Sequence, residues 1–111
     1  MRYMALIFGD ESAQGNGPEM LPAYEKFGKE ATEAGVIRGG DALQPSTTAT
    51  VVRVRGGKTQ TTDGPFAETK EQLAGYYELD CKDLDEAIKW AAKIPGASSG
   101  SVEVRPIREF N

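Results

Sequence analysis

The sequence predicts a single α+β domain, because strand-like and helix-like segments alternate along its 111 residues. An apolar strand opens the chain, two amphipathic helical segments follow, and a strand-like segment closes it. The expected elements are strands at 2–8, 36–43, 49–55, 58–62, 73–80 and 102–110, and helices at 20–34 and 84–94. Helices placed between strands in this order are typical of a ferredoxin-like, split βαβ sheet with both helices on one face.

The first strand is apolar on both of its faces, because side chains alternate along an extended chain. One face carries Tyr3, Ala5 and Ile7, and the other carries Met4, Leu6 and Phe8. Helices on one face of the sheet leave the other face uncovered. The sheet of an identical chain is the simplest cover for it, so we expect a homodimer.

The first helix has recognisable limits. Apolar residues recur every three or four positions from Met20 to Ala34, which places them on one helical face. Pro22 is tolerated only in a first turn, so the regular helix is expected to begin near Leu21. Gly35 is a natural residue to follow the end of the helix.

The second helix is expected to begin after Asp83, because Asp83 and Glu86 have the spacing of a capping box. Pro95 and the glycine after it end this helix. In the last strand, Pro106 favours an edge position, since proline cannot donate a hydrogen bond to a neighbouring strand.

Two β-branched runs joined by Gly56 and Gly57 predict a β-hairpin. Arg53 and Arg55 share one face of its first strand. If that face lines a barrel, the guanidinium groups could hold an anion. If it faces water, which is the commoner arrangement, they are ordinary solvent-exposed polar residues.

Composition excludes several classes of function. The chain has no histidine, which rules out a Ser-His-Asp triad, a histidine-bound zinc and a histidine base within it. Its net charge of −4 without a long basic run argues against nucleic-acid binding. No apolar run approaches the roughly 20 residues of a membrane helix. The lone Cys81 cannot form an internal disulfide and fits the reducing cytoplasm.

No metal or cofactor site is expected. Without histidine or paired cysteines, only a hard cation held by oxygen ligands would fit the chain. Such a site would need Asp10, Glu11, Asp41 or Asp63 to converge, and nothing in their spacing requires that.

The most distinctive segment is 62–71, TDGPFAETKE. Asp63, Gly64 and Pro65 specify a tight turn, and the stretch 67–72 could form one helical turn. Glu68, Lys70 and Glu71 could then rim a pocket, since loops held by rigid turns often carry sites. The alternative is a structural turn followed by a solvated charged surface.

This segment, extended to TDGPFAETKEQL, closely resembles the signature of the DGPF-type YCII-related proteins. The stretches MRYMALIFGDE, GVIRGGDALQPSTTATVVRVRGGK and SVEVRPIREF also look like that family, so the resemblance covers nearly all of a single domain at 1–111. It implies a ferredoxin-like α+β fold that pairs into a dimeric α+β barrel. It also implies a sigma-factor-linked regulatory context, in a family largely without assigned function.

The shorter YCII branch is proposed to use a His-Asp pair in a pocket. By its spacing to Gly35, Tyr24 here matches that histidine. Tyrosine has an ordinary pKa of about 10 and is a far weaker base than histidine, so the dyad mechanism is not carried over. The alternative role for Tyr24 is packing on the helix face, with its hydroxyl kept for a polar partner.

We therefore expect a cytoplasmic homodimer that binds a small metabolite in a pocket near the turn at 63–66, without nucleic-acid or membrane partners. The alternatives are a small enzyme of proton-transfer or hydrolytic type, with Asp63 as base, Lys70 as electrostatic partner and Tyr24 as donor, and a protein-interaction module that works with transcription machinery. The expected binding residues are Tyr24, Asp41, Asp63, Phe66, Glu68, Lys70 and Glu71.

Overall fold

The computed structural model describes residues 1–13 and 18–110. Its centre is a four-stranded sheet in the order β2-β5-β1-β6, in which all neighbours are antiparallel. The strands are β1 (Arg2–Gly9), β2 (Ile37–Ala42), β5 (Gln72–Asp80) and β6 (Ser101–Pro106). The small α+β fold predicted from the sequence is confirmed, and β6 lies at the sheet edge as Pro106 indicated.

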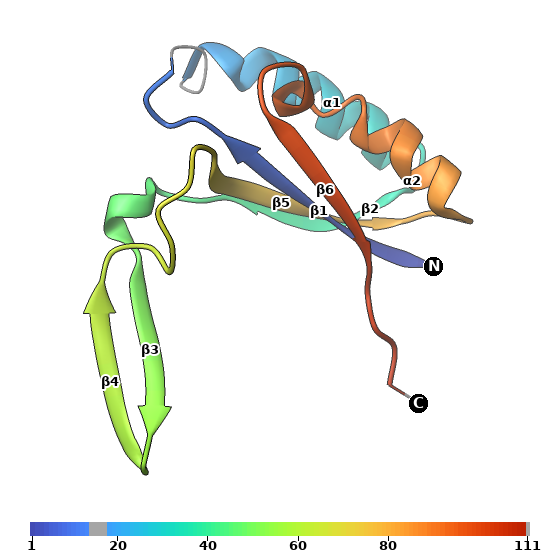
Figure 1. Ribbon diagram of the computed structural model, residues 1–111. Helices are drawn as coiled ribbons and strands as arrows, with labels where there is room; N and C mark the ends of the chain where they lie inside the picture. Colours follow the sequence, from blue (N-terminus) through green and yellow to red (C-terminus); the bar gives the residue numbers. More distant parts are fainter. Residues whose placement is uncertain (14–17, 111) are drawn as a thin grey trace.

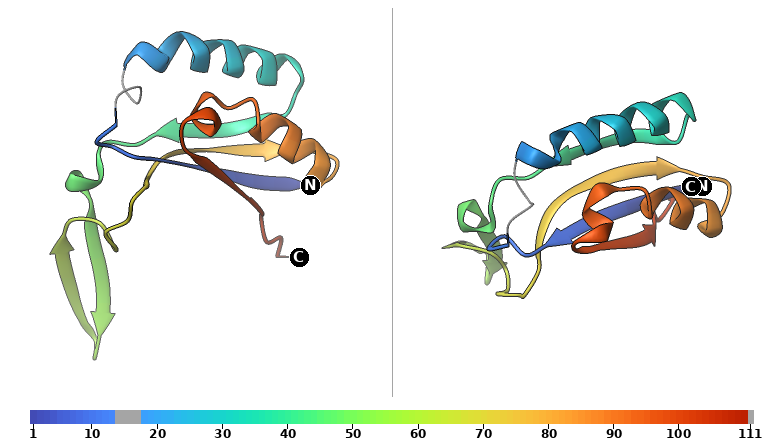
Figure 2. Two further views of the ribbon diagram at one scale, coloured as in Figure 1. Left: turned by 45° about the horizontal axis from the view of Figure 1, so that its top comes forward. Right: turned by 90° about the horizontal axis from the view of Figure 1, so that it is seen from above.

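Two helices, α1 (Leu21–Glu33) and α2 (Leu84–Ala91), cover one face of this sheet (Figure 1 and Figure 2). Helix α1 begins at Leu21 with Pro22 in its first turn, and Gly35 follows its C-cap with φ +74°. Helix α2 begins after Asp83, whose carboxylate accepts a 2.9 Å hydrogen bond from the backbone N–H of Glu86. The described part of the chain also has three short 3-10 turns: η1 (Pro18–Met20), η2 (Ser46–Thr48) and η3 (Pro95–Ser98).

The core lies between the helices and the sheet. Leu79 and Ile94 are fully buried there, and Phe27 packs against the rings of Tyr77 and Trp90. Cys81 is buried in the same core, and burial raises the pKa of its thiol. A buried thiol with a raised pKa is a poor nucleophile.

No helix of the described residues lies over the opposite face of the sheet (Figure 1). Met4, Leu6 and Phe8 are partly exposed there, whereas the core-facing Tyr3, Ala5 and Ile7 are buried, so the predicted two-faced strand is confirmed. On the uncovered face Met4 lies between Glu78 and Arg105, and Leu6 lies between Tyr76 and Glu103. An apolar row with polar and charged residues on both sides of it therefore faces outward. We call this surface the bare face.

The predicted hairpin forms, but it is separate from the main sheet. Strands β3 (Thr50–Arg55) and β4 (Lys58–Asp63) make their own two-stranded sheet, closed by Gly56 and Gly57 at positive φ. Figure 1 shows it projecting from the body on the side away from the helices. We call residues 50–63 the arm. It explains why the Cα radius of gyration is 15.7 Å, against roughly 13 Å for a compact chain of this length.

The segment 67–72 is not helical. Residues 64–71 form neither helix nor strand, and β5 begins at Gln72. The side-chain amide of Gln72 donates to the carbonyl of Thr69 at 2.6 Å, which fixes the segment as an irregular turn. The stretch has no apolar face that could pack against the body, so a helical turn gains nothing from burial there.

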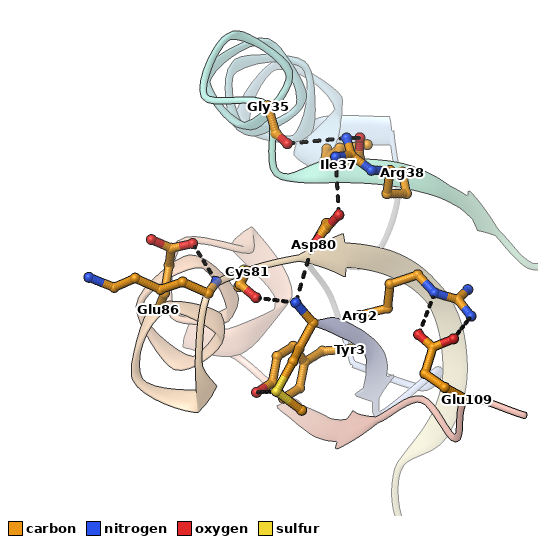
Figure 3. Close-up of polar contacts among 11 residues, drawn as sticks. Arg2, Tyr3, Gly35, Ile37, Arg38, Asp80, Cys81, Glu86 and Glu109 are labelled. Atoms are coloured by element: carbon orange, nitrogen blue, oxygen red, sulfur yellow. Dashed lines mark hydrogen bonds and ion pairs between the residues drawn. The ribbon is translucent and has the colours of Figure 1, made fainter. Parts of the chain in front are cut away.

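Ion pairs hold the sheet at the end where β1 begins (Figure 3). Asp80 accepts from the N-terminal amine at 3.4 Å through Oδ1 and from Arg38 at 3.1 Å through Oδ2. Arg2 donates to Glu78 at 2.8 Å and to both carboxylate oxygens of Glu109 at 3.0 Å.

Neither described helix has the length and apolar character that a membrane span requires.

Candidate functional site

A hollow of about 610 Å³ lies between the first turn of α1 and the ends of three strands. We call it the first hollow. Tyr77 comes from the helix-covered face of the sheet, where it packs on Phe27, and Tyr76 comes from the bare face beside Leu6. The lining residues are Met20, Leu21 and Tyr24 at the start of α1, Ile7–Gly9 of β1, Gly40–Ala42 of β2 with Leu43, Ala74–Tyr77 of β5, Gly96 of η3, and Ser99.

Tyr24 is a half-buried polar group of this hollow. Its hydroxyl oxygen accepts a 3.1 Å hydrogen bond from the backbone N–H of Gly96, which joins α1 to η3. Burial raises the pKa of Tyr24, and burial with the nearby Tyr24 raises the pKa of Tyr77. Both phenols therefore stay protonated at neutral pH and can donate hydrogen bonds, and neither can act as a base there.

The other polar contact of the first hollow joins two strands. The hydroxyl of Tyr76 on β5 donates a 3.1 Å hydrogen bond to Oδ2 of Asp41 on β2. This bond and the negative charge of Asp41 raise the pKa of Tyr76. Gly40 permits the close approach of the strands, because a Cβ there would lie 2.5 Å from the carbonyl oxygen of Tyr76. The result is an exposed carboxylate at the edge of a mainly apolar hollow.

A second hollow of about 520 Å³ lies where the arm joins the body. Phe8 and Leu43 line both hollows, so the two are neighbours. Phe66 is 80 % exposed at the second hollow, and the guanidinium carbon of Arg53 lies 5.8 Å from the centre of its ring. The lining residues are Phe8, Leu43–Ser46, Thr48, Ala49, Pro65–Ala67, Thr69, Gln72 and Leu73.

The structure brings some of the expected site residues together and separates others. Tyr24 and Asp41 share the first hollow, and Phe66 lines the second. The remaining four line neither hollow in the described part of the chain. Asp63 is exposed on the arm opposite Thr50, Glu68 and Lys70 are exposed, and Glu71 accepts a 2.8 Å hydrogen bond from Ser101 Oγ.

The residues expected from the sequence to form the site did not include Tyr76 or Tyr77. Their neighbouring positions on one strand place them on opposite faces, which is a signal available from sequence. The pairing of Tyr76 with Asp41 depends on the alignment of β2 and β5, which a bulge between Ile37 and Gly39 shifts. That alignment could not be predicted locally.

Glu11 is a second residue that sequence reasoning did not place. Its carboxylate accepts from the backbone N–H of Ser46 at 2.7 Å and from Ser46 Oγ at 2.8 Å. The backbone N–H of Glu11 in turn donates to the side-chain oxygen of Gln72 at 2.9 Å. These bonds fasten the connection that leads from β2 into the arm.

Within residues 1–13 and 18–110, no three acidic or cysteine side chains are grouped to hold a metal ion.

The sequence is similar to known proteins over nearly its whole length. An uncharacterized protein of Rhizobium meliloti (strain 1021) is 39% identical over 114 residues, which cover 96% of this chain and 92% of that protein. The family model of the YCII-related domain matches residues 1–111. The chain therefore belongs to the YCII-related domain family.

Proposed function

We propose that this protein is a homodimer that binds a small metabolite in the first hollow, as a sensor or accessory module. The observation that carries the proposal is the pairing of Asp41 with Tyr76 at the edge of a hollow of about 610 Å³. That volume is within the range of small-molecule sites, roughly 300–1,000 Å³, which are mostly apolar with a few placed polar groups.

The lining indicates the chemistry of the ligand. Met20, Leu21 and Phe8 offer apolar contact, and the Asp41 carboxylate accepts hydrogen bonds. A fitting molecule has an apolar portion and a hydroxyl or amine that donates to Asp41. An anionic group would be repelled by the same carboxylate.

The bare face supports the homodimer part of the proposal. Its apolar row, Met4, Leu6 and Phe8, is only partly exposed within one chain and gains burial if a second sheet packs on it. Tyr76 lies on this face beside Leu6, and Phe8 lines the first hollow. A second copy on this face would therefore also narrow the opening of the hollow. The sigma-factor-linked context remains part of the proposal on the family resemblance alone.

The arrangement favours binding over catalysis. Proton transfer with Asp63 as base, Lys70 as partner and Tyr24 as donor needs the three around one cavity. Among the described residues Tyr24 lines the first hollow, whereas Asp63 and Lys70 line neither hollow. The protonated phenols can orient a ligand by donating hydrogen bonds to it, which is a binding role.

A metabolite-library thermal-shift screen tests the ligand proposal. At a hundredfold excess over its dissociation constant, a ligand adds about 2.7 kcal/mol to the free energy of unfolding, which raises the melting temperature by several degrees. We expect Asp41→Asn to lose the shift and Glu68→Gln, a change at an exposed loop carboxylate, to keep it. A library without any hit, or equal shifts in both variants, would contradict the proposal.

Light scattering tests the homodimer separately. At micromolar concentration the wild-type protein should have twice the chain mass of 12.0 kDa. Leu6→Lys, which places a charge in the apolar row of the bare face, should give monomers. Thr32→Lys, an exposed change on α1, should not. A wild-type protein that is monomeric at this concentration would exclude the dimer.

A further inference from the structure

We propose that the arm of one chain packs on the body of a second copy through the face that carries Val52 and Val54. The inference rests on the proposed homodimer and assigns it a second contact, in addition to the bare face. The proposal follows from the two-faced character of the arm, its attachment near its base, its charge and its direction.

The two faces of the arm differ in chemistry. Val52 pairs with Thr61 and Val54 pairs with Thr59, which gives the outer part of one face a β-branched surface without charge. Asp63, opposite Thr50, lies on the same face at the base of the arm. Both valines are 60% exposed. The opposite face carries Arg53, Arg55, Gln60 and Lys58 beside Val51 and Thr62. An alternating apolar and polar strand is the pattern of a sheet with one buried face, yet in one chain nothing described covers the valines.

Among the described residues, the arm is held near its base. There the backbone N–H of Gly64 donates to the carbonyl of Ala49 at 2.7 Å, which closes the hairpin, and Arg53 stacks on Phe66 of the segment that follows. Among the described strands, β3 and β4 pair only with each other. An isolated two-stranded hairpin is marginally stable in water, so its outer part needs packing from elsewhere.

Charge favours a second copy as the source of that packing. The arm holds three of the thirteen lysines and arginines and one of the seventeen acidic residues, so its formal charge is +2. The rest of the chain consequently carries −6. The arm of one copy and the body of another are therefore attracted, and this attraction would orient the encounter.

Direction and length place the arm where a second copy would be. Figures 1 and 2 show it leaving the body on the side of the bare face. Six residues in each strand extend about 20 Å, because a strand rises roughly 3.3 Å per residue. Sheets that pack face to face are about 10 Å apart. In a dimer joined by its bare faces, the arm therefore extends past the interface and alongside the body of the partner.

Hydrogen exchange with mass spectrometry on the full-length protein tests this contact, together with light scattering on the same samples. Val54→Lys adds a charge to the valine face, and Gln60→Lys adds the same charge to the opposite face at a neighbouring position. We expect the amides of 50–63 to be protected in the wild-type dimer. Val54→Lys should lose that protection and raise the dimer dissociation constant at least tenfold, whereas Gln60→Lys should change either quantity less than twofold.

The outcomes separate this inference from the proposed function. A wild-type protein that stays monomeric overturns the homodimer and the arm contact together. A wild-type dimer whose arm amides exchange as fast as those of an open chain overturns the arm contact alone, as do equal effects of the two variants. Carbodiimide cross-linking in a mixture of isotopically light and heavy chains adds a direct check. Lys58 should join carboxylates of the other copy, and links confined to one chain would contradict the contact.

Discussion

The hydroxyl of Tyr76 lies 3.1 Å from Oδ2 of Asp41, and this hydrogen bond joins strands β5 and β2 beside the first hollow. The two residues are 35 positions apart in sequence. The contact holds the Asp41 carboxylate, a hydrogen-bond acceptor, in one orientation at the edge of an apolar hollow. It also links the hollow to the bare face, because Tyr76 lies beside Leu6 there.

Replacement of Asp41 should change the titration of one tyrosine. The hydrogen bond to Asp41 is the main cause that raises the pKa of Tyr76. In Asp41→Asn the negative charge is gone, so the pKa of Tyr76 should fall toward about 10. Phenolate absorbance during an alkaline titration measures the tyrosine pKa values, and comparison with Tyr76→Phe identifies the transition that belongs to Tyr76. Identical titrations of the wild type and Asp41→Asn would contradict the contact.

Gly40 should be intolerant of a side chain, whereas its neighbour Gly39 should accept one. A Cβ at Gly40 would lie 2.5 Å from both the carbonyl oxygen of Tyr76 and Cδ1 of Tyr77, but a Cβ at Gly39 would meet nothing within 4 Å. Overpacking of this kind costs about 1–3 kcal/mol. Urea unfolding should show that loss in Gly40→Ala and a much smaller change in Gly39→Ala. Equal stability of the two variants would exclude the close approach of the strands.

Loss of the Tyr24 hydroxyl should destabilise the protein. In Tyr24→Phe the N–H of the buried Gly96 loses its acceptor. A buried donor left without a partner costs about 1–3 kcal/mol. Tyr76→Phe is the matched control, because its hydrogen bond is exposed to water and the change should be close to neutral. Chemical denaturation of both variants measures the difference in their free energies of unfolding. Equal values would contradict the prediction and would mean that water replaces the Tyr24 hydroxyl as partner of the Gly96 N–H.

The stability of the protein should fall in acid. The hydrogen bond with the N-terminal amine, assisted by Arg38, lowers the pKa of Asp80, and the hydrogen bond from Arg2 lowers the pKa of Glu109. Below about pH 4 the unfolded chain takes up protons at these two carboxylates that the folded chain does not. The stability that the two ionised carboxylates contribute is therefore present above that pH and is lost as the pH falls. Arg38→Gln should reduce this loss, and Lys26→Gln should not. Melting temperatures measured across the acid range test this prediction. If the melting temperature of Arg38→Gln depends on pH as strongly as that of the wild type, the result would count against the ion pair between Arg38 and Asp80.

The stability of the first turn of α2 should depend on Asp83 more than on the nearby Asp85. The Asp83 carboxylate caps the backbone N–H of Glu86, and the carboxylate of Glu86 accepts from the N–H of Lys82 at 3.1 Å. Loss of such a cap costs about 0.5–2 kcal/mol. Asp83→Ala should show this loss by thermal denaturation, whereas Asp85→Ala, which has no capping role, should lose less. The reverse order would contradict the cap.

Local signals in the amino-acid sequence were sufficient to locate most of the helices and strands. Residue spacing on one helical face, Pro22 and Gly35 located α1, and the Asp83 cap located α2, because these signals act within one or two turns. The apolar run of β1 likewise showed that this strand has two apolar faces, since side-chain direction in a strand follows from local geometry.

Contacts between residues distant in sequence could not be predicted in the same way. Tyr76 lies beside Asp41 because a bulge sets the alignment of β2 and β5, and Asp63 lies on the arm because β3 and β4 pair with each other alone. Local periodicity gives the face of a strand on which a side chain lies. It does not give the residue opposite on the next strand, or the direction in which a hairpin leaves the body. Those depend on hydrogen bonds and packing between segments distant in sequence.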